Sequence, residues 1–105
     1  MATPTRERIP HPDVSAFELA TIMRTLGDPV RLEIVRVLAD GGEHLCGELS
    51  TKLAIPASTG SYHLKLLREA GLTRTRSEGT QRLISLRSED LESHFPGLVN
   101  VLTAT

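Results

Sequence analysis

The sequence predicts a small, mainly α-helical domain that contains one β-hairpin. Two amphipathic segments, 45–53 and about 58–70, follow one another with only a short turn between them, as two helices of a helix-turn-helix do. Residues 72–76 and 81–86 then have the composition of two strands, joined by a stretch whose glycine suits a positive-φ turn. With two helices before them and a helical segment after them, these elements have the order of a winged helix-turn-helix.

The N-terminal region is predicted to contain a flexible arm, residues 1–12, ahead of the folded domain, residues 13–105. The arm has three prolines and no apolar periodicity. Ser15 followed by Glu18 fits a capping box, which predicts that the first helix begins there. The apolar pattern continues to Gly27, a residue type that often ends helices.

The second helix has a strong local start signal at Asp28-Pro29. The aspartate can accept hydrogen bonds at the N-cap, and the proline fixes φ at the first helical position. We therefore expect a helix from Pro29 to Asp40, stopped by the two glycines that follow. Its apolar residues are expected to pack in the core with Met23 of the first helix.

The third and fourth helices form the predicted helix-turn-helix. The third, over residues 45–53, has leucines spaced i, i+4 and i+8. The fourth begins after Pro56 and ends at Ala70, with Gly71 as its C-terminal cap. Gly60 lies on its inward face, where the missing side chain lets the preceding helix approach closely. The opposite face is then free to enter a groove.

A last helical segment is predicted to begin at Ser88, whose hydroxyl is expected to cap it ahead of acidic residues. Pro96-Gly97 interrupts the segment, so we expect a kink or two short helices. Its apolar stripe needs more cover than a 105-residue monomer provides, which predicts a homodimer. The predicted dimer-interface residues are Phe17, Leu91, Phe95, Leu98 and Leu102.

Charge is segregated along the chain, although the net charge is only −1. Residues 52–87 contain seven basic and two acidic residues, so the rest of the chain is acidic. A basic excess is often only a solvated surface, but here it coincides with the predicted helix-turn-helix and hairpin. This coincidence favours a nucleic acid as the partner.

The composition argues against several other classes of protein. Cys46 is the only cysteine, so an internal disulfide and a four-cysteine zinc site are excluded. No apolar run approaches the roughly 18 residues of a membrane span, and the N-terminus lacks the apolar core of a signal peptide. We expect a cytoplasmic protein without membrane association.

Four strings of the sequence resemble the ArsR/SmtB family of bacterial transcriptional regulators. They are LGDPVRLEIVRVLADG (26–41), GELS (47–50), STGSYHLKLLREAGL (58–72) and the wing pattern R-x-R-x-E-G (74–79). The resemblance extends over roughly residues 14–102. It implies a dimeric winged-helix repressor whose first and last helices form the dimer interface and whose fourth helix lies in the major groove of DNA.

The predicted function is sequence-specific binding of double-stranded DNA by a homodimeric repressor. We expect the repressor to bind an inverted-repeat operator and to occupy the promoter until an unidentified signal releases it. Short hydroxyls and one amphipathic ring near a helix N-terminus can reach base edges and phosphates, and basic side chains hold phosphates. The recognition-helix candidates are Ser58, Thr59, Ser61, Tyr62 and Lys65. The wing candidates are Arg74, Arg76, Gln81 and Arg82.

The alternative function is a winged-helix protein-interaction module that does not bind DNA, because a fold alone does not fix function. The basic excess on the groove-facing segment argues against it. An enzyme is not expected, since the sequence has no paired carboxylates, nucleophile motif or phosphate loop. His44 with Cys46 is the only conceivable catalytic pair, and its close spacing on a short segment makes a productive geometry implausible.

The metal-sensing residues of the family it resembles are incomplete in this sequence. The best-known metal box has two cysteines, one residue apart, where Cys46 aligns with the position between them. The second known site uses carboxylates and histidines of the last helices, where only Asp90 and His94 are present, and we expect both to have a structural or solvated role. We expect Cys46 to be a buried thiol beside a loop residue, His44, and His63 to be a hydrogen-bonded scaffold residue. No metal or cofactor is predicted, and no small-molecule effector is identified.

Overall fold

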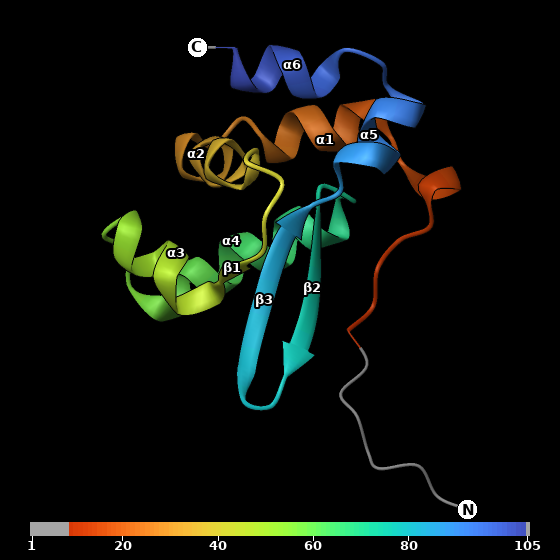
Figure 1. The fold of residues 1–105 in the computed structure, drawn as a ribbon. Helices are drawn as coiled ribbons and strands as arrows, with labels where there is room; N and C mark the ends of the chain where they lie inside the picture. Colours follow the sequence, from red (N-terminus) through yellow and green to blue (C-terminus); the bar gives the residue numbers. More distant parts are fainter. Residues whose placement is uncertain (1–8, 105) are drawn as a thin grey trace, which may run out of the picture.

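The computed structural model describes residues 9–104 and confirms the predicted fold class. Helices surround one end of a small antiparallel sheet, and the β2–β3 hairpin projects away from them (Figure 1). The helices are the 3-10 turn η1 (Val14–Ala16), α1 (Leu19–Thr25), α2 (Pro29–Leu38), α3 (Cys46–Lys52), α4 (Ala57–Glu69), α5 (Ser88–His94) and α6 (Leu98–Thr103). The strands are β1 (His44–Leu45), β2 (Thr73–Glu78) and β3 (Gln81–Leu86).

The sheet has three strands, in the order β1-β3-β2, rather than the two of the predicted hairpin. His44 pairs with Ile84 and Leu45 with Leu83, so β1 extends the hairpin on the β3 side. A two-residue strand has no periodicity of its own, which is why the sequence pattern missed it. The predicted turn is present, with Gly79 at φ +61°.

The start of the first helix differs from its prediction. Asp13, not Ser15, is the capping residue, and its carboxylate accepts hydrogen bonds from the Ser15 backbone N–H (3.0 Å) and hydroxyl (2.7 Å). The turn that it caps is the short η1. Glu18 is extended and α1 begins one residue later, at Leu19, so the predicted capping box is wrong.

The second helix begins as predicted and ends two residues early. Asp28 Oδ1 accepts from the backbone N–H of Val30 (2.8 Å) and Arg31 (3.1 Å), and Pro29 is the first helical residue. These backbone hydrogen bonds lower the pKa of Asp28, and the one from Arg31 has the larger effect. The helix ends at Leu38 instead of Asp40.

The C-terminal segment forms two short helices, as expected from Pro96-Gly97. Gly97 separates them at φ +90°, a left-handed conformation that favours glycine. The predicted cap at Ser88 is wrong, because Arg87 occupies the N-cap position, Ser88 is already helical, and no side chain caps this end.

The core explains why part of the predicted dimer interface is not on the surface. Phe17, Leu91 and Leu98 are buried within the chain, so they need no cover from a partner. Phe95 and Leu102 are only partly buried against the same core. The Phe17 ring packs against Gly71 (φ +89°), where any Cβ would overlap it.

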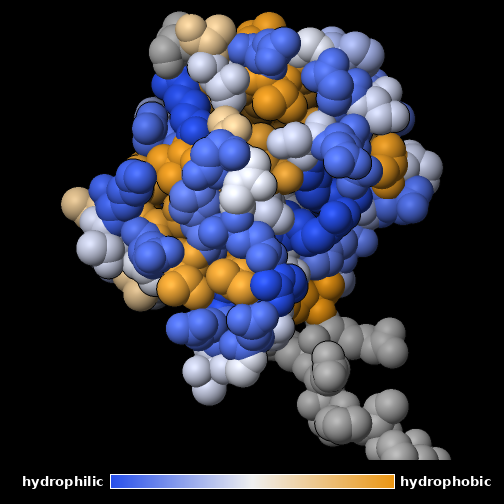
Figure 2. All heavy atoms as spheres, in the orientation of Figure 1, coloured by the Kyte–Doolittle hydropathy of each residue, from blue (hydrophilic) through white to orange (hydrophobic). Residues whose placement is uncertain are grey.

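Apolar side chains are exposed instead on α1 and α6. Leu19 is 46%, Met23 47% and Val101 71% exposed, so the prediction that Met23 lies in the core is wrong. Figure 2 has the same orientation as Figure 1. At the top of the molecule, where Figure 1 places α1 and α6, it shows apolar surface between hydrophilic side chains.

The predicted flexible arm falls partly outside the described residues, since 1–8 are not described. Residues 9–12 are described and contact the sheet. The backbone N–H of Thr75 donates to His11 Nε2 (3.0 Å), and Arg87 Nη1 donates to the Pro12 carbonyl (2.8 Å). Among residues 9–104, no helix is long and apolar enough to cross a membrane.

Candidate nucleic-acid interface

The position of α4 is set by its close approach to α3. Gly60 is buried at the crossing, and a Cβ built there would overlap the Ser50 hydroxyl and lie 3.6 Å from Ile55 Cδ1. The prediction that Gly60 permits this approach is confirmed. Because Gly60, Leu64 and Leu67 hold the inward face of α4 against the core, the helix presents its other face outward.

The outward face of α4 carries the five predicted recognition residues. All are exposed, and Tyr62 is 58% exposed. They are Ser58, Thr59, Ser61, Tyr62 and Lys65. The structure therefore brings them together on one surface, and their contact with DNA stays a prediction.

His63, between them in sequence, faces inward. It is 9% exposed, and its Nδ1 lies 3.2 Å from Arg31 Nη1 of α2. Arg31 Nε in turn donates to the Thr25 carbonyl (2.6 Å). This chain of contacts links α4 to α2 and to the end of α1, so His63 is the hydrogen-bonded scaffold residue that was expected.

The predicted wing arginines lie on opposite faces of the β2–β3 sheet. Cross-strand partners share a face, and the register pairs Thr75 with Ile84 and Ser77 with Arg82. A hollow is lined by side chains of α4 together with Thr75, Arg82 and Ile84, so this face of the sheet meets α4. Arg74 and Arg76 alternate with Thr75 and therefore lie on the other face.

Arg76 is bound by two carboxylates. Its Nε and Nη2 donate to Glu43 Oε2 (2.6 Å) and Oε1 (2.8 Å), and its Nη1 donates to Glu78 Oε2 (3.0 Å). The hydrogen bond from Arg76 lowers the pKa of Glu43. The pKa of Arg76 is raised, chiefly by the hydrogen bond to Glu43 and next by the one to Glu78. The pair joins the wing to the loop before β1, a link between residues 33 positions apart that no local pattern reveals.

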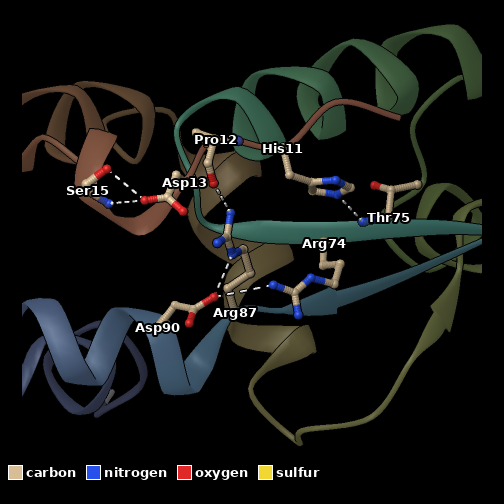
Figure 3. A network of polar contacts seen from close by, with 8 residues as sticks. All are labelled: His11, Pro12, Asp13, Ser15, Arg74, Thr75, Arg87 and Asp90. Carbon is tan, nitrogen blue, oxygen red and sulfur yellow. Dashed lines mark hydrogen bonds and ion pairs between the residues drawn. The ribbon is translucent and has the colours of Figure 1, made fainter. Parts of the chain in front are cut away.

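Arg74 and Arg87 share one carboxylate at the base of the hairpin (Figure 3). Asp90 Oδ2 lies 3.3 Å from Arg74 Nη2 and 3.0 Å from Arg87 Nε. Arg87 is 7% exposed, and its guanidinium also lies 4.9 Å from the centroid of the Phe17 ring. This cluster joins β2, α5 and the segment before α1, and it assigns Asp90 a structural role, as expected.

The residues considered for metal binding have other contacts. His44 Nε2 lies 2.9 Å from Asp40 Oδ2, and His94 packs edge-on against Phe95, with ring centroids 4.7 Å apart. Cys46, the first residue of α3, packs against the core but is only partly buried, so the expectation of a buried thiol is met only in part. Within residues 9–104, no three His, Cys, Asp or Glu side chains are grouped in a way that would hold a metal ion.

An outward-facing helix held by a tight helix-turn-helix, beside a projecting hairpin, defines a winged helix-turn-helix protein. A model described as a helix-turn-helix domain matches residues 26–76. The HTH-type transcriptional regulator YceK of Bacillus subtilis strain 168 is 43% identical over 84 residues, which cover 79% of this chain and 84% of that protein.

Two solved structures extend the comparison. The transcriptional repressor BigR from Xylella fastidiosa has a TM-score of 0.66 and 34% identity, covering 82% of this chain and 83% of that one. A homodimeric winged helix-turn-helix DNA-binding domain from Mycobacterium bovis, described as a possible ArsR-family transcriptional regulator, has a TM-score of 0.68 and 29% identity, covering 82% and 78%. The chain belongs to the ArsR/SmtB family of winged helix-turn-helix regulators, and it is a DNA-binding transcriptional regulator.

Proposed function

We propose that the protein is a cytoplasmic repressor that binds an inverted-repeat operator as a homodimer and occupies the promoter until an unidentified signal releases it. The similarity to a structure described as a transcriptional repressor, and to another described as homodimeric, supports this proposal. In such dimers, the two recognition helices read half-sites about one helical turn apart.

The observation that carries the proposal is the exposed hydroxyl-rich face of α4 beside Arg82. Ser61 and Tyr62 are exposed near the N-terminal half of the helix, where side chains reach base edges in the major groove. Lys65 and Arg82 flank the same hollow and supply charge for backbone phosphates. The sheet face that Arg82 shares with α4 makes it the wing cation best placed to act with the recognition helix.

Arg74 and Arg76 have a smaller part in this proposal. Each would exchange a carboxylate for a phosphate on binding DNA, because Asp90 and Glu43 hold them in the free protein. Gln81 is exposed next to the turn of the hairpin and carries no charge, so it needs no such exchange. We propose that it approaches the duplex at the wing tip.

The proposed dimer face combines α1 and α6. Leu19, Met23 and Val101 are the exposed apolar side chains there, and Phe95 and Leu102 are partly buried beside the core. Association would remove this apolar surface from water, at roughly 25 cal/mol per Å². Sedimentation equilibrium at micromolar concentration is expected to give twice the monomer mass, and Val101→Glu is expected to shift the protein to monomer.

The function is tested by selecting bound sequences from a pool of random duplexes and measuring affinity for the enriched sequence and a scrambled one. We expect an inverted repeat. Ser61→Ala or Tyr62→Ala should weaken operator binding by about 1–3 kcal/mol and change binding to the scrambled duplex little. If no sequence is enriched and neither duplex binds, the protein is an interaction module and the proposal is wrong.

A further inference from the structure

Between α4 and the sheet lies a half-open hollow of about 310 Å³. We propose that it is a binding site for a phosphate group. Three cationic side chains line it, Lys65 and Arg68 from α4 and Arg82 from β3, together with the hydroxyls of Ser61 and Thr75. None of the described residues that line it carries a carboxylate. The apolar part of its lining is formed by Cys46, Leu64 and Ile84. The hollow therefore combines an apolar floor with cations and hydrogen-bond donors, and the latter are the groups that bind a phosphate.

Secondary structure brings these groups together. Ser61, Lys65 and Arg68 are spaced i, i+4 and i+7, so they form one stripe along α4 that faces the sheet. Arg82 enters from the opposite wall, two positions along β3 from Ile84, whose partner is Thr75. The cations thus converge from two elements instead of lying along one solvated helix face.

Arg68 provides the second observation. Its Nε is buried and has no hydrogen-bond partner within residues 9–104, whereas Arg74, Arg76 and Arg87 all donate to carboxylate oxygens. A buried N–H of a charged group without an acceptor costs free energy, and that cost is recovered when an acceptor enters. The fork of a guanidinium matches two oxygens of one phosphate, so Arg68 is the residue on which we expect binding to depend most.

The position of the hollow indicates where the phosphate comes from. Ser61 and Lys65 belong both to its lining and to the exposed face of α4, so it opens onto the proposed DNA-binding surface. A phosphate of the DNA backbone is the first source, and this part of the inference rests on the proposed function. A free phosphate compound is the other source, and it would occupy the same donors.

The site is tested first on the protein alone, with inorganic phosphate titrated at constant ionic strength against chloride while backbone amide signals are followed by NMR. Saturable shifts are expected for residues 61–68 and for Thr75. Arg68→Ala should weaken binding about tenfold or more, and Arg68→Lys, which keeps the charge but loses the fork, should weaken it less. Arg24→Ala, an equal loss of charge at an exposed position on α1, is the control and should titrate as the wild type does.

The second experiment separates the two sources. If the pocket holds a backbone phosphate, Arg68→Ala should lower the slope of log K against log salt by about one unit. Inorganic phosphate should then compete with DNA beyond the effect of ionic strength. If inorganic phosphate binds, but does not compete with DNA and binds equally with and without the duplex, the site takes a free phosphate compound.

Some outcomes would overturn the inference. Absence of saturable shifts in the wild type, or equal titrations of the wild type and Arg68→Ala, would show that the hollow is not a phosphate site. A thermal unfolding curve of each variant shows that the fold is intact. If the wild type binds no duplex, the proposed function fails, while the titration with inorganic phosphate still decides the pocket.

Discussion

The two faces of the β2–β3 sheet carry the same kind of residue in different surroundings. On the face toward α4, Arg82 lies with Lys65 and Arg68 around a hollow that has no carboxylate among its lining residues within 9–104. On the other face, Arg74 and Arg76 meet Asp90 and Glu43. An arginine count cannot distinguish these faces, because it does not show which groups the fold places beside each guanidinium. From this comparison we predict that the face toward α4 contributes more to DNA binding and that the other face contributes mainly structural links.

The structural role of the second face predicts the largest effect, at Arg87. Arg87→Ala removes a buried guanidinium that donates to Asp90 and to the Pro12 carbonyl and stacks on Phe17. We expect the free energy of unfolding in urea to fall by about 2–4 kcal/mol. Arg24→Ala, exposed on α1, should change it by less than about 0.5 kcal/mol. An Arg87→Ala variant as stable as wild type would show that the network does not hold this region together.

The next effect compares the two faces directly in DNA binding. Arg82→Ala should weaken binding to operator and scrambled duplexes alike, by about three- to tenfold near 0.1 M salt, and lower the salt slope by about one unit. Arg74→Ala, an equal loss of charge on the same sheet, should cost less because Arg74 lies on the sheet face away from α4. A larger loss for Arg74→Ala than for Arg82→Ala would reverse the assignment of the faces.

A smaller effect is expected at Glu43. Glu43→Gln weakens the acceptor that holds Arg76 and removes a negative charge near the duplex. DNA affinity should therefore rise by about two- to fivefold at low salt, and the gain should shrink as salt screens the charges. In the Arg76→Ala background the same substitution should give a much smaller gain. An equal gain in both backgrounds would mean that Glu43 acts as a distant charge rather than through Arg76.

The smallest effect concerns pH and His11, which accepts a hydrogen bond from Thr75 at the outer edge of β2. Burial lowers the pKa of His11, the guanidinium groups of Arg74, Arg87 and Arg68 act in the same direction, and a backbone hydrogen bond with Ile9 opposes them. The unfolded chain therefore binds more protons than the folded one just below the ordinary histidine pKa of about 6.5.

Because of this difference, the contribution of His11 to stability is complete above about pH 6.5 and is lost as pH falls through the folded pKa. His11→Gln, which keeps an acceptor but cannot be protonated, should flatten the pH dependence of unfolding between about pH 7 and pH 5. An NMR titration should place the His11 midpoint below about 6.5. A midpoint above that value would contradict the contact with Thr75.

The sequence by itself determined the features that depend on neighbouring residues. Asp28-Pro29 set the start of α2, Gly71 followed the end of α4, and Pro96-Gly97 split the last helix, because caps and fixed backbone angles act within a few positions. The spacing of Gly60 and the leucines of α4 also fixed which side of that helix faces outward. The candidate recognition residues follow from that local pattern.

The tertiary structure alone decided which residues meet across long separations. The two-residue β1 exists only because β3 lies beside it, Phe17 is buried while Met23 is exposed, and Arg76 meets Glu43. Arg68, absent from the predicted site, lines the hollow because α4 lies over the sheet, although its spacing from Ser61 and Lys65 was visible in the sequence. Such pairings depend on packing between elements, which a periodicity within one element does not encode.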